Sequence, residues 1–160
     1  MKTQLLFTRF GSIAEAVCEL LCGAHETVDA ALYRFNHPRL AEALSDASQR
    51  GVRVRLVLDY GKFAESTTTK HLLVPAPLAM RLLHGRRGQG SKMHHKFAIL
   101  DSQMVLTGSY NWTLESEDLN YENLVVLSGS EVVDAYGSEF EALWSAGSEL
   151  DSASDTGIGN

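Results

Sequence analysis

The sequence predicts an α/β domain in which a mixed, mainly parallel sheet is flanked by helices on both faces. The first observation is a strand, a helix and a second strand over 27–59 with short connections, the pattern of a parallel βαβ unit. The second is a set of short apolar runs between 78 and 128, followed by an amphipathic stretch at 131–146. With 160 residues and 44% hydrophobic content, the chain can bury one core. We therefore expect a single domain at 1–148 and a flexible, polar tail at 149–160.

The N-terminal half supplies the βαβ unit. Apolar residues recur at helical spacing up to Gly23, which is a stop signal. Pro38 stands in the first turn of the next helical stretch and Gly51 lies past its end, as is typical of helix boundaries. The run "VRVRLVLD" alternates apolar and polar residues, which indicates a strand. The expected elements are, in order, a helix at 10–22, a strand at 27–35, a helix at 37–50 and a strand at 52–59.

The C-terminal half supplies further strands and a closing helix. "PAP" ends a short helical stretch, and the glycines of "GRRGQG" indicate a flexible loop. In the last helix, the apolar residues fall on one side, which is expected to face the core. The expected elements are a helix at 64–74, strands at 78–85, 94–101, 104–111 and 122–128, and a helix at 131–146.

Two cysteines, Cys18 and Cys22, lie four apart in "AVCELLCGAH", which places them on one face of a helix. The ligands are too few for a closed zinc site, so we interpret them as two buried thiols. Glu15 and Glu19 interrupt the apolar residues near the N-terminus, and no run approaches the roughly eighteen apolar residues of a membrane span. We expect no signal peptide, no stable membrane association and a cytoplasmic location.

Charge is distributed unevenly along the chain. The net charge is −6. Residues 1–96 contain all fourteen Lys and Arg together with eight Asp and Glu, whereas residues 97–160 contain twelve Asp and Glu and no Lys or Arg. The basic half includes the run "HGRRGQGSKMHHK". Such a cluster is most often a solvated loop, but it can also bind phosphates. The candidate substrate-binding residues are Arg86, Arg87, Lys92 and Trp112. Trp112 is expected either to stack on nucleobases or to be a core residue.

The residues most suggestive of chemistry lie in "SKMHHKFAILDSQMVLTGSYNW". If a strand begins at His94, the two-residue period of side chains places His94 and Lys96 on one face and sends His95 to the other, into the fold. The same period pairs Ser109 with Asn111 on the next strand. A nucleophile or base, a cation and a neutral amide on one patch suit an anionic phosphate.

Two carboxylates accompany this patch. Asp101 lies five residues beyond Lys96 and would face away on an unbroken strand, so a supporting role in a turn or salt bridge is expected. Glu122 opens the next strand, where its carboxylate can accept a hydrogen bond from one ring nitrogen of His94. Such a bond would fix the tautomer and leave the other nitrogen free to attack.

The spacing His94-x-Lys96-x4-Asp101-x6-Gly108-Ser109-x-Asn111 resembles the HKD signature of the phospholipase D superfamily. "GSYNWT" followed by "NYENLVVL" is similar to the continuation of this motif in the small single-motif nucleases of that superfamily. The upstream strand-helix-strand is similar to its opening unit, so the resemblance covers residues 10–146.

The resemblance implies a metal-independent phosphodiesterase that needs no cofactor. In this superfamily one histidine attacks phosphorus to form a phosphohistidine, and the histidine of a second motif protonates the leaving group. Because this chain carries one motif, the resemblance implies a homodimer in which two copies of His94 meet. The substrate it implies is DNA or RNA. The alternatives are a phospholipase D acting on lipids such as cardiolipin, and a non-catalytic module that binds nucleic acid.

Overall fold

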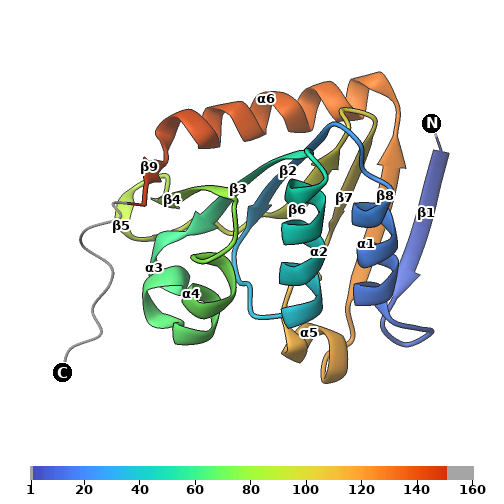
Figure 1. The fold of residues 1–160 in the computed structure, drawn as a ribbon, viewed down its shortest axis with the longest axis horizontal. Coiled ribbons are helices and arrows are strands. Elements are labelled where there is room, and N and C mark those ends of the chain that lie inside the picture. Colours follow the sequence, from blue (N-terminus) through green and yellow to red (C-terminus); the bar gives the residue numbers. More distant parts are fainter. Residues whose placement is uncertain (1, 151–160) are drawn as a thin grey trace.

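The computed structural model describes residues 2–150, which form one nine-stranded sheet with helices on both faces (Figure 1). The strand order is β1-β8-β7-β6-β2-β3-β4-β5, and β9 pairs with β4. The strands are β1 (Lys2–Phe7), β2 (Thr27–Leu32), β3 (Arg53–Asp59), β4 (Ala79–Gly85), β5 (Gly88–Lys92), β6 (Lys96–Leu100), β7 (Met104–Gly108), β8 (Asn123–Ser128) and β9 (Ser148–Glu149). The helices are α1 (Ile13–Cys22), α2 (Pro38–Gln49), α3 (Tyr60–Glu65), α4 (Thr67–Leu73), α5 (Leu114–Asp118) and α6 (Ser130–Ala146).

The mixed sheet and its covering helices agree with the predicted fold class, but the pairing is mostly antiparallel. Among the strands of residues 2–150, the only neighbours that pair in parallel are β2 with β3 and β3 with β4. The expectation of a mainly parallel sheet is corrected because β6, β7, β8 and β1 pair antiparallel, one after another, on the other side of β2.

The predicted βαβ unit is present as β2, α2 and β3. Pro38 is the first residue of α2, where its missing N–H leaves no helical hydrogen bond unmade. Gly51 follows the helix with φ of 96°, a conformation that glycine adopts without strain. The alternation in β3 buries Val54 and Leu56 beneath the helices.

Two apolar clusters hold the sheet between its helices. The larger one joins the sheet to α1 and α2 and to the short helices α3 and α4, with Leu40 and Leu44 of α2 fully buried. The smaller one packs Val133 and Phe140 of α6 against Ala31 and other residues on the opposite face. Alternate strand residues therefore serve opposite faces, as the two-residue period requires.

Several sequence expectations are corrected at the edges of the sheet. The segment read as a flexible glycine loop forms a hairpin, because β5 pairs with β4. The helix expected at 64–74 is two short helices, and β1 and α5 were not anticipated. Glu149, assigned to the tail, belongs to β9. The rest of the tail expected over 149–160, apart from residue 150, lies outside the described residues.

The two thiols on α1 are not buried. Cys18 is partly exposed and Cys22 is exposed, so the expectation of two buried thiols is wrong. The apolar face of α1 is carried instead by Ile13, Val17 and Leu21. None of the helices described within residues 2–150 is both long and apolar enough to cross a bilayer.

Candidate active site

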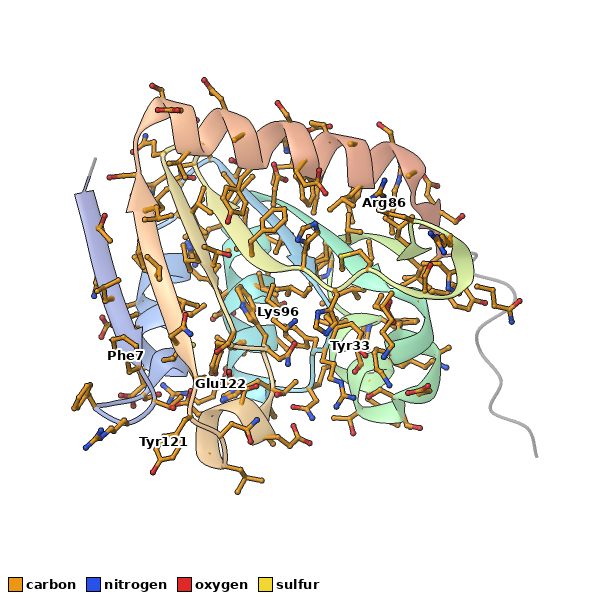
Figure 2. All side chains as sticks on the ribbon, turned by 180° about the vertical axis from the view of Figure 1, so that it is seen from behind. Phe7, Tyr33, Arg86, Lys96, Tyr121 and Glu122 are labelled. Carbon is orange, nitrogen blue, oxygen red and sulfur yellow. The ribbon has the colours of Figure 1, made fainter. Side chains whose placement is uncertain are left out.

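The HKD-type residues gather at one edge of the sheet. Because β6 is antiparallel to β2, its first residue lies beside the carboxyl end of β2, where Leu32 pairs with Lys96. At the same edge β7 ends at Gly108, which pairs with Leu124 near the start of β8. Figure 2 shows Lys96 between Tyr33, which follows β2, and Glu122, which precedes β8.

His94 is held between an aromatic ring and a cation. Its imidazole lies against the phenol ring of Tyr33, with ring centroids 4.3 Å apart. The Lys96 ammonium lies 3.3 Å from His94 Nδ1 and donates to the His94 carbonyl at 2.9 Å. The structure thus brings His94 and Lys96 together as predicted. The reason differs, since β6 begins at Lys96 and His94 precedes the strand.

The surroundings of His94 favour its neutral form. Burial lowers the pKa of His94, and the positive charges of Lys96 and Lys92 lower it further. Burial likewise lowers the pKa of Lys96, which the nearby carboxylate of Glu122 partly offsets. A ring nitrogen that accepts a hydrogen bond from an ammonium must carry a lone pair. A neutral imidazole has one unprotonated nitrogen, and an unprotonated nitrogen is what a nucleophilic histidine needs.

His95 turns to the opposite face, as predicted, but it does not enter the core. Its Nε2 lies 3.0 Å from a carboxylate oxygen of Glu139 on α6, and its ring meets Phe97 edge-on. The side chain is about half exposed. The expectation of a buried His95 is corrected because this residue sits before the strand, at the rim of the α6 face.

Glu122 contacts Ser109 and not His94. Ser109 Oγ donates to one carboxylate oxygen of Glu122, while the other accepts from Ser116 and Asn120, each at 3.2 Å. Within the part of the chain that the structure describes, no hydrogen bond joins Glu122 to the imidazole of His94. The predicted carboxylate-histidine bond is therefore corrected, since the carboxylate is already occupied by donors on its own side of the site.

Ser109 and Asn111 lie beyond the end of β7, not on it. Ser109 Oγ accepts the backbone N–H of Asn123 at 3.0 Å, which fixes the start of β8 against the site. The side-chain oxygen of Asn111 is buried and makes no hydrogen bond to the described residues. Gly108 allows this arrangement, because a Cβ there would overlap the Asn123 carbonyl.

Asp101 lies at the far end of β6 from His94. Its carboxylate accepts the backbone N–H groups of His25, Glu26 and Thr27 at 2.8 to 3.2 Å. Burial raises the pKa of Asp101, but these donors outweigh it and the net pKa is lowered. This agrees with the supporting role expected, in which Asp101 anchors the start of β2 and not the substrate.

The predicted substrate-binding residues separate into two groups. Arg86, labelled in Figure 2, and Lys92 line an open groove of about 640 Å³ that also contains His94. Arg87 does not line it and instead closes the β4–β5 turn through its N–H to Ser91 Oγ. Trp112 is 1% exposed and packs near Phe35, so of the two alternatives for this residue the core position is confirmed and the stacking platform is not.

The sequence suggested Tyr33 as a nucleobase-stacking or core residue, but it did not predict the contact of this ring with His94. Its ring is buried, and the cationic groups of Arg34, Lys92 and Lys96 lie 5.3 to 5.9 Å from its centroid. The signal was available, since Tyr33 and Asp59 stand at the carboxyl ends of neighbouring parallel strands, where α/β proteins place their sites. Over residues 2–150, no three His, Cys, Asp or Glu side chains are arranged to hold a metal ion.

Comparison with known proteins places this geometry in a family. The chain is 38% identical over 125 residues to mitochondrial cardiolipin hydrolase from Xenopus tropicalis. The aligned region covers 78% of this chain and 58% of that protein. The chain thus spans little more than half the length of that relative. The structure superimposes on NUC, a phospholipase D family member from Salmonella typhimurium, with a TM-score of 0.85 at 24% identity, over 94% of this chain and 99% of that one.

NucT from Helicobacter pylori is similarly related, with a TM-score of 0.84 at 25% identity, over 93% of this chain and 99% of that one. Residues 17–144 match the family described as "Cardiolipin synthase, PLD-like domain". Because that match spans most of the chain, the protein belongs to the phospholipase D-like family.

Proposed function

We propose that this protein is a phosphodiesterase that hydrolyses DNA or RNA through a covalent phosphohistidine on His94. The observation that carries the proposal is the contact between the Lys96 ammonium and the imidazole of His94, whose pKa is lowered so that the neutral form is favoured. A neutral ring supplies the attacking lone pair, and the adjacent cation stabilises the negative charge that develops on the phosphoryl oxygens.

Two steps complete the reaction. First, a nitrogen of His94 forms an N–P bond, the P–O bond to the leaving alcohol breaks, and a second, protonated histidine gives its proton to the leaving oxygen. Then this second histidine takes a proton from water as the water oxygen bonds to phosphorus and the N–P bond breaks. The two histidines start in opposite protonation states, so the pair gives a bell-shaped pH profile.

The second histidine is proposed to be His94 of another copy of this chain. An exposed apolar surface beside Glu122 supports a homodimer, since Phe10 is 80% and Tyr121 91% exposed. Phe7 and Leu5 of β1 continue this surface, and Figure 2 shows Phe7 and Tyr121 at the same corner as Glu122. Single exposed apolar residues are normal, but a contiguous group marks an interaction site.

A nucleic-acid substrate is favoured by the cations around the site. Arg86 and Lys92 line the groove that contains His94, and the Arg34 guanidinium lies 5.5 Å from the centroid of the Tyr33 ring. Successive phosphates of a polynucleotide match such a row of cations. The proposed association is with nucleic acid, without stable attachment to a membrane.

A second candidate is hydrolysis of a phospholipid such as cardiolipin. It is favoured by the name of the Xenopus tropicalis relative. It is also favoured by the apolar part of the same groove, which Leu83, Met93, Leu143 and Ala146 provide. Acyl chains bind such surfaces, whereas a polynucleotide gains little from them.

The test is to incubate the protein in EDTA with single-stranded DNA, RNA, duplex DNA and cardiolipin liposomes. Cleavage of a nucleic acid supports the first candidate, and release of phosphatidic acid supports the second. The variant His94→Ala is expected to lose turnover while keeping the solution mass of a dimer. Unchanged turnover in this variant, or an active strict monomer, would contradict the proposed mechanism.

A further inference from the structure

His94 lies on a short segment that belongs to no strand. β5 ends at Lys92 and β6 begins at Lys96, so Met93, His94 and His95 bridge them without regular pairing. A nucleophile must be held to within a fraction of an ångström of its productive position. The groups that fix this bridge therefore determine where the imidazole stands.

Besides the bond from the Lys96 ammonium to the His94 carbonyl, two hydrogen bonds hold the backbone of the bridge, one on each side of His94. The backbone N–H of Tyr33 donates to the His95 carbonyl at 2.8 Å. The backbone N–H of Met93 donates to Asp59 Oδ2 at 2.9 Å. Met93 is itself buried in the apolar cluster beneath α6. The carboxyl ends of β2 and β3 thus clamp the bridge from two sides.

Asp59 accepts one hydrogen bond more than its role as a helix cap requires. It is the last residue of β3, is 3% exposed, and accepts the Lys62 N–H at the start of α3 through Oδ1 at 2.9 Å. Ser, Thr, Asn and Asp all serve as caps of this kind. The second oxygen, which reaches a residue 34 positions further along the chain, has no part in capping.

We infer that Asp59 is a positioning residue for His94, and that its carboxylate fixes the Met93 backbone and thereby the imidazole against Tyr33 and Lys96. The inference rests on the proposed function of His94 as nucleophile. A carboxylate is required because two N–H donors face it and each needs its own acceptor. Asparagine would turn its NH₂ toward one of them and leave a buried donor unpaired.

Asp59 also affects the pKa of His94 through its negative charge. Burial and the positive charges of Lys96, Lys92 and Arg34 lower the pKa of His94, and the carboxylate of Asp59 opposes them. Its removal is therefore expected to lower the pKa of His94 further. In a pH profile, the limb that reports protonation of the nucleophile would move to lower pH.

The first experiment compares kcat and KM for bis(p-nitrophenyl) phosphate in three variants. Asp59→Ser keeps a good helix cap but is too short to reach Met93, and Asp59→Asn keeps the shape but loses one acceptor. Both are expected to lower kcat about 10²-fold, the effect of a roughly 1 Å misplacement, with little change in KM. Asp59→Glu, which keeps both oxygens and the charge, is expected to restore part of kcat.

The matched control is Asp29→Asn. Asp29 makes a bidentate pair with Arg55, so the variant has the same chemical change and a loss of stability. Its kcat is expected to remain that of the wild type, because it touches no part of the bridge. Equal kcat values for Asp59→Asn and Asp29→Asn would overturn the inference.

A second measurement separates this inference from the proposed function. If the wild type cleaves no phosphodiester, the proposed function fails, and nuclear magnetic resonance then decides the role of Asp59. The Met93 amide should exchange slowly in the wild type, and the His94 ring should titrate at lower pH in Asp59→Ser than in Asp29→Asn. A fast-exchanging Met93 amide in the wild type overturns the inference even if the Asp59 variants fail to fold.

Discussion

Replacing Arg55 by methionine should destabilise the protein far more than the same replacement at Arg53, two residues before it on β3. The guanidinium makes two 2.8 Å bonds to Asp29 and one of 2.6 Å to Glu141 on α6. It also lies 4.9 Å from the ring centroid of Phe140 and 5.2 Å from that of Trp144. Arg55 therefore joins β2 and β3 to the helix that covers them, and its pKa is raised by the hydrogen bond to Asp29.

The magnitude follows from burial. Arg55 and Asp29 side chains are each 13% exposed, and breaking a buried pair costs about 3–5 kcal/mol because one charge is left without a partner. Methionine keeps the apolar stem, and Arg53 remains 3.6 Å from Asp29, so the lower part of that range applies. We expect a loss of about 3 kcal/mol in the free energy of unfolding. At about 2–4 °C per kcal/mol, Tm would fall by roughly 10 °C.

Urea unfolding at pH 7 and pH 3 measures this effect, with Arg53→Met as the matched control. Arg53 is mostly exposed, so its loss should cost under about 1 kcal/mol. The hydrogen bond from Arg55 lowers the pKa of Glu141, so this part of the stabilisation is present above the unfolded pKa of about 4.3 and is lost as pH falls through the folded value. The difference between wild type and Arg55→Met should therefore shrink at pH 3. Equal losses in the two variants at pH 7 would refute the reasoning.

Two further substitutions test the site and its support. Gly108→Ala places a methyl group against the Asn123 carbonyl and should displace Ser109, so we expect turnover to fall at least tenfold. The control is Gly137→Ala, whose added Cβ meets open space. A fully active Gly108→Ala variant would contradict this expectation. Trp112→Ala removes a buried core ring and should cost about 3–5 kcal/mol in unfolding experiments, without a specific loss of affinity for nucleic acid in the folded fraction. A loss of affinity at unchanged stability would restore Trp112 as a stacking residue.

Local signals in the sequence were sufficient for the βαβ unit and for the pair of His94 and Lys96. Pro38 and Gly51 mark helix boundaries by their own backbone restrictions. His94 precedes β6 and Lys96 opens it, and their contact is local, since the Lys96 ammonium reaches the ring and the carbonyl of a residue only two positions away. Such features depend only on neighbours in the chain.

Features that depend on distant partners were not accessible in the same way. Glu122 is occupied by Ser109 because the loops after β7 and before β8 meet, which a strand pattern does not specify. From the sequence, Asp59 is expected to be the end of a strand and a helix cap. Only the fold brings the backbone N–H of Met93 to the second carboxylate oxygen of Asp59. The exposure of Cys18 and Cys22 likewise depends on where α2 packs against α1.

The position of β1 at the end of the sheet affects how the protein can be made. Among the strands that the structure describes, β1 pairs with β8 alone. Leu5 lies opposite Val125, so more than a hundred residues must be synthesised after β1 before its partner is available. Contacts so distant in sequence form late, because the loop entropy is lost before the pairing is gained. The loop that carries Glu122 emerges from the ribosome just before β8. In a growing chain, Ser109 therefore lacks its Glu122 partner until β8 has been made, so this side of the candidate site forms only as the sheet closes.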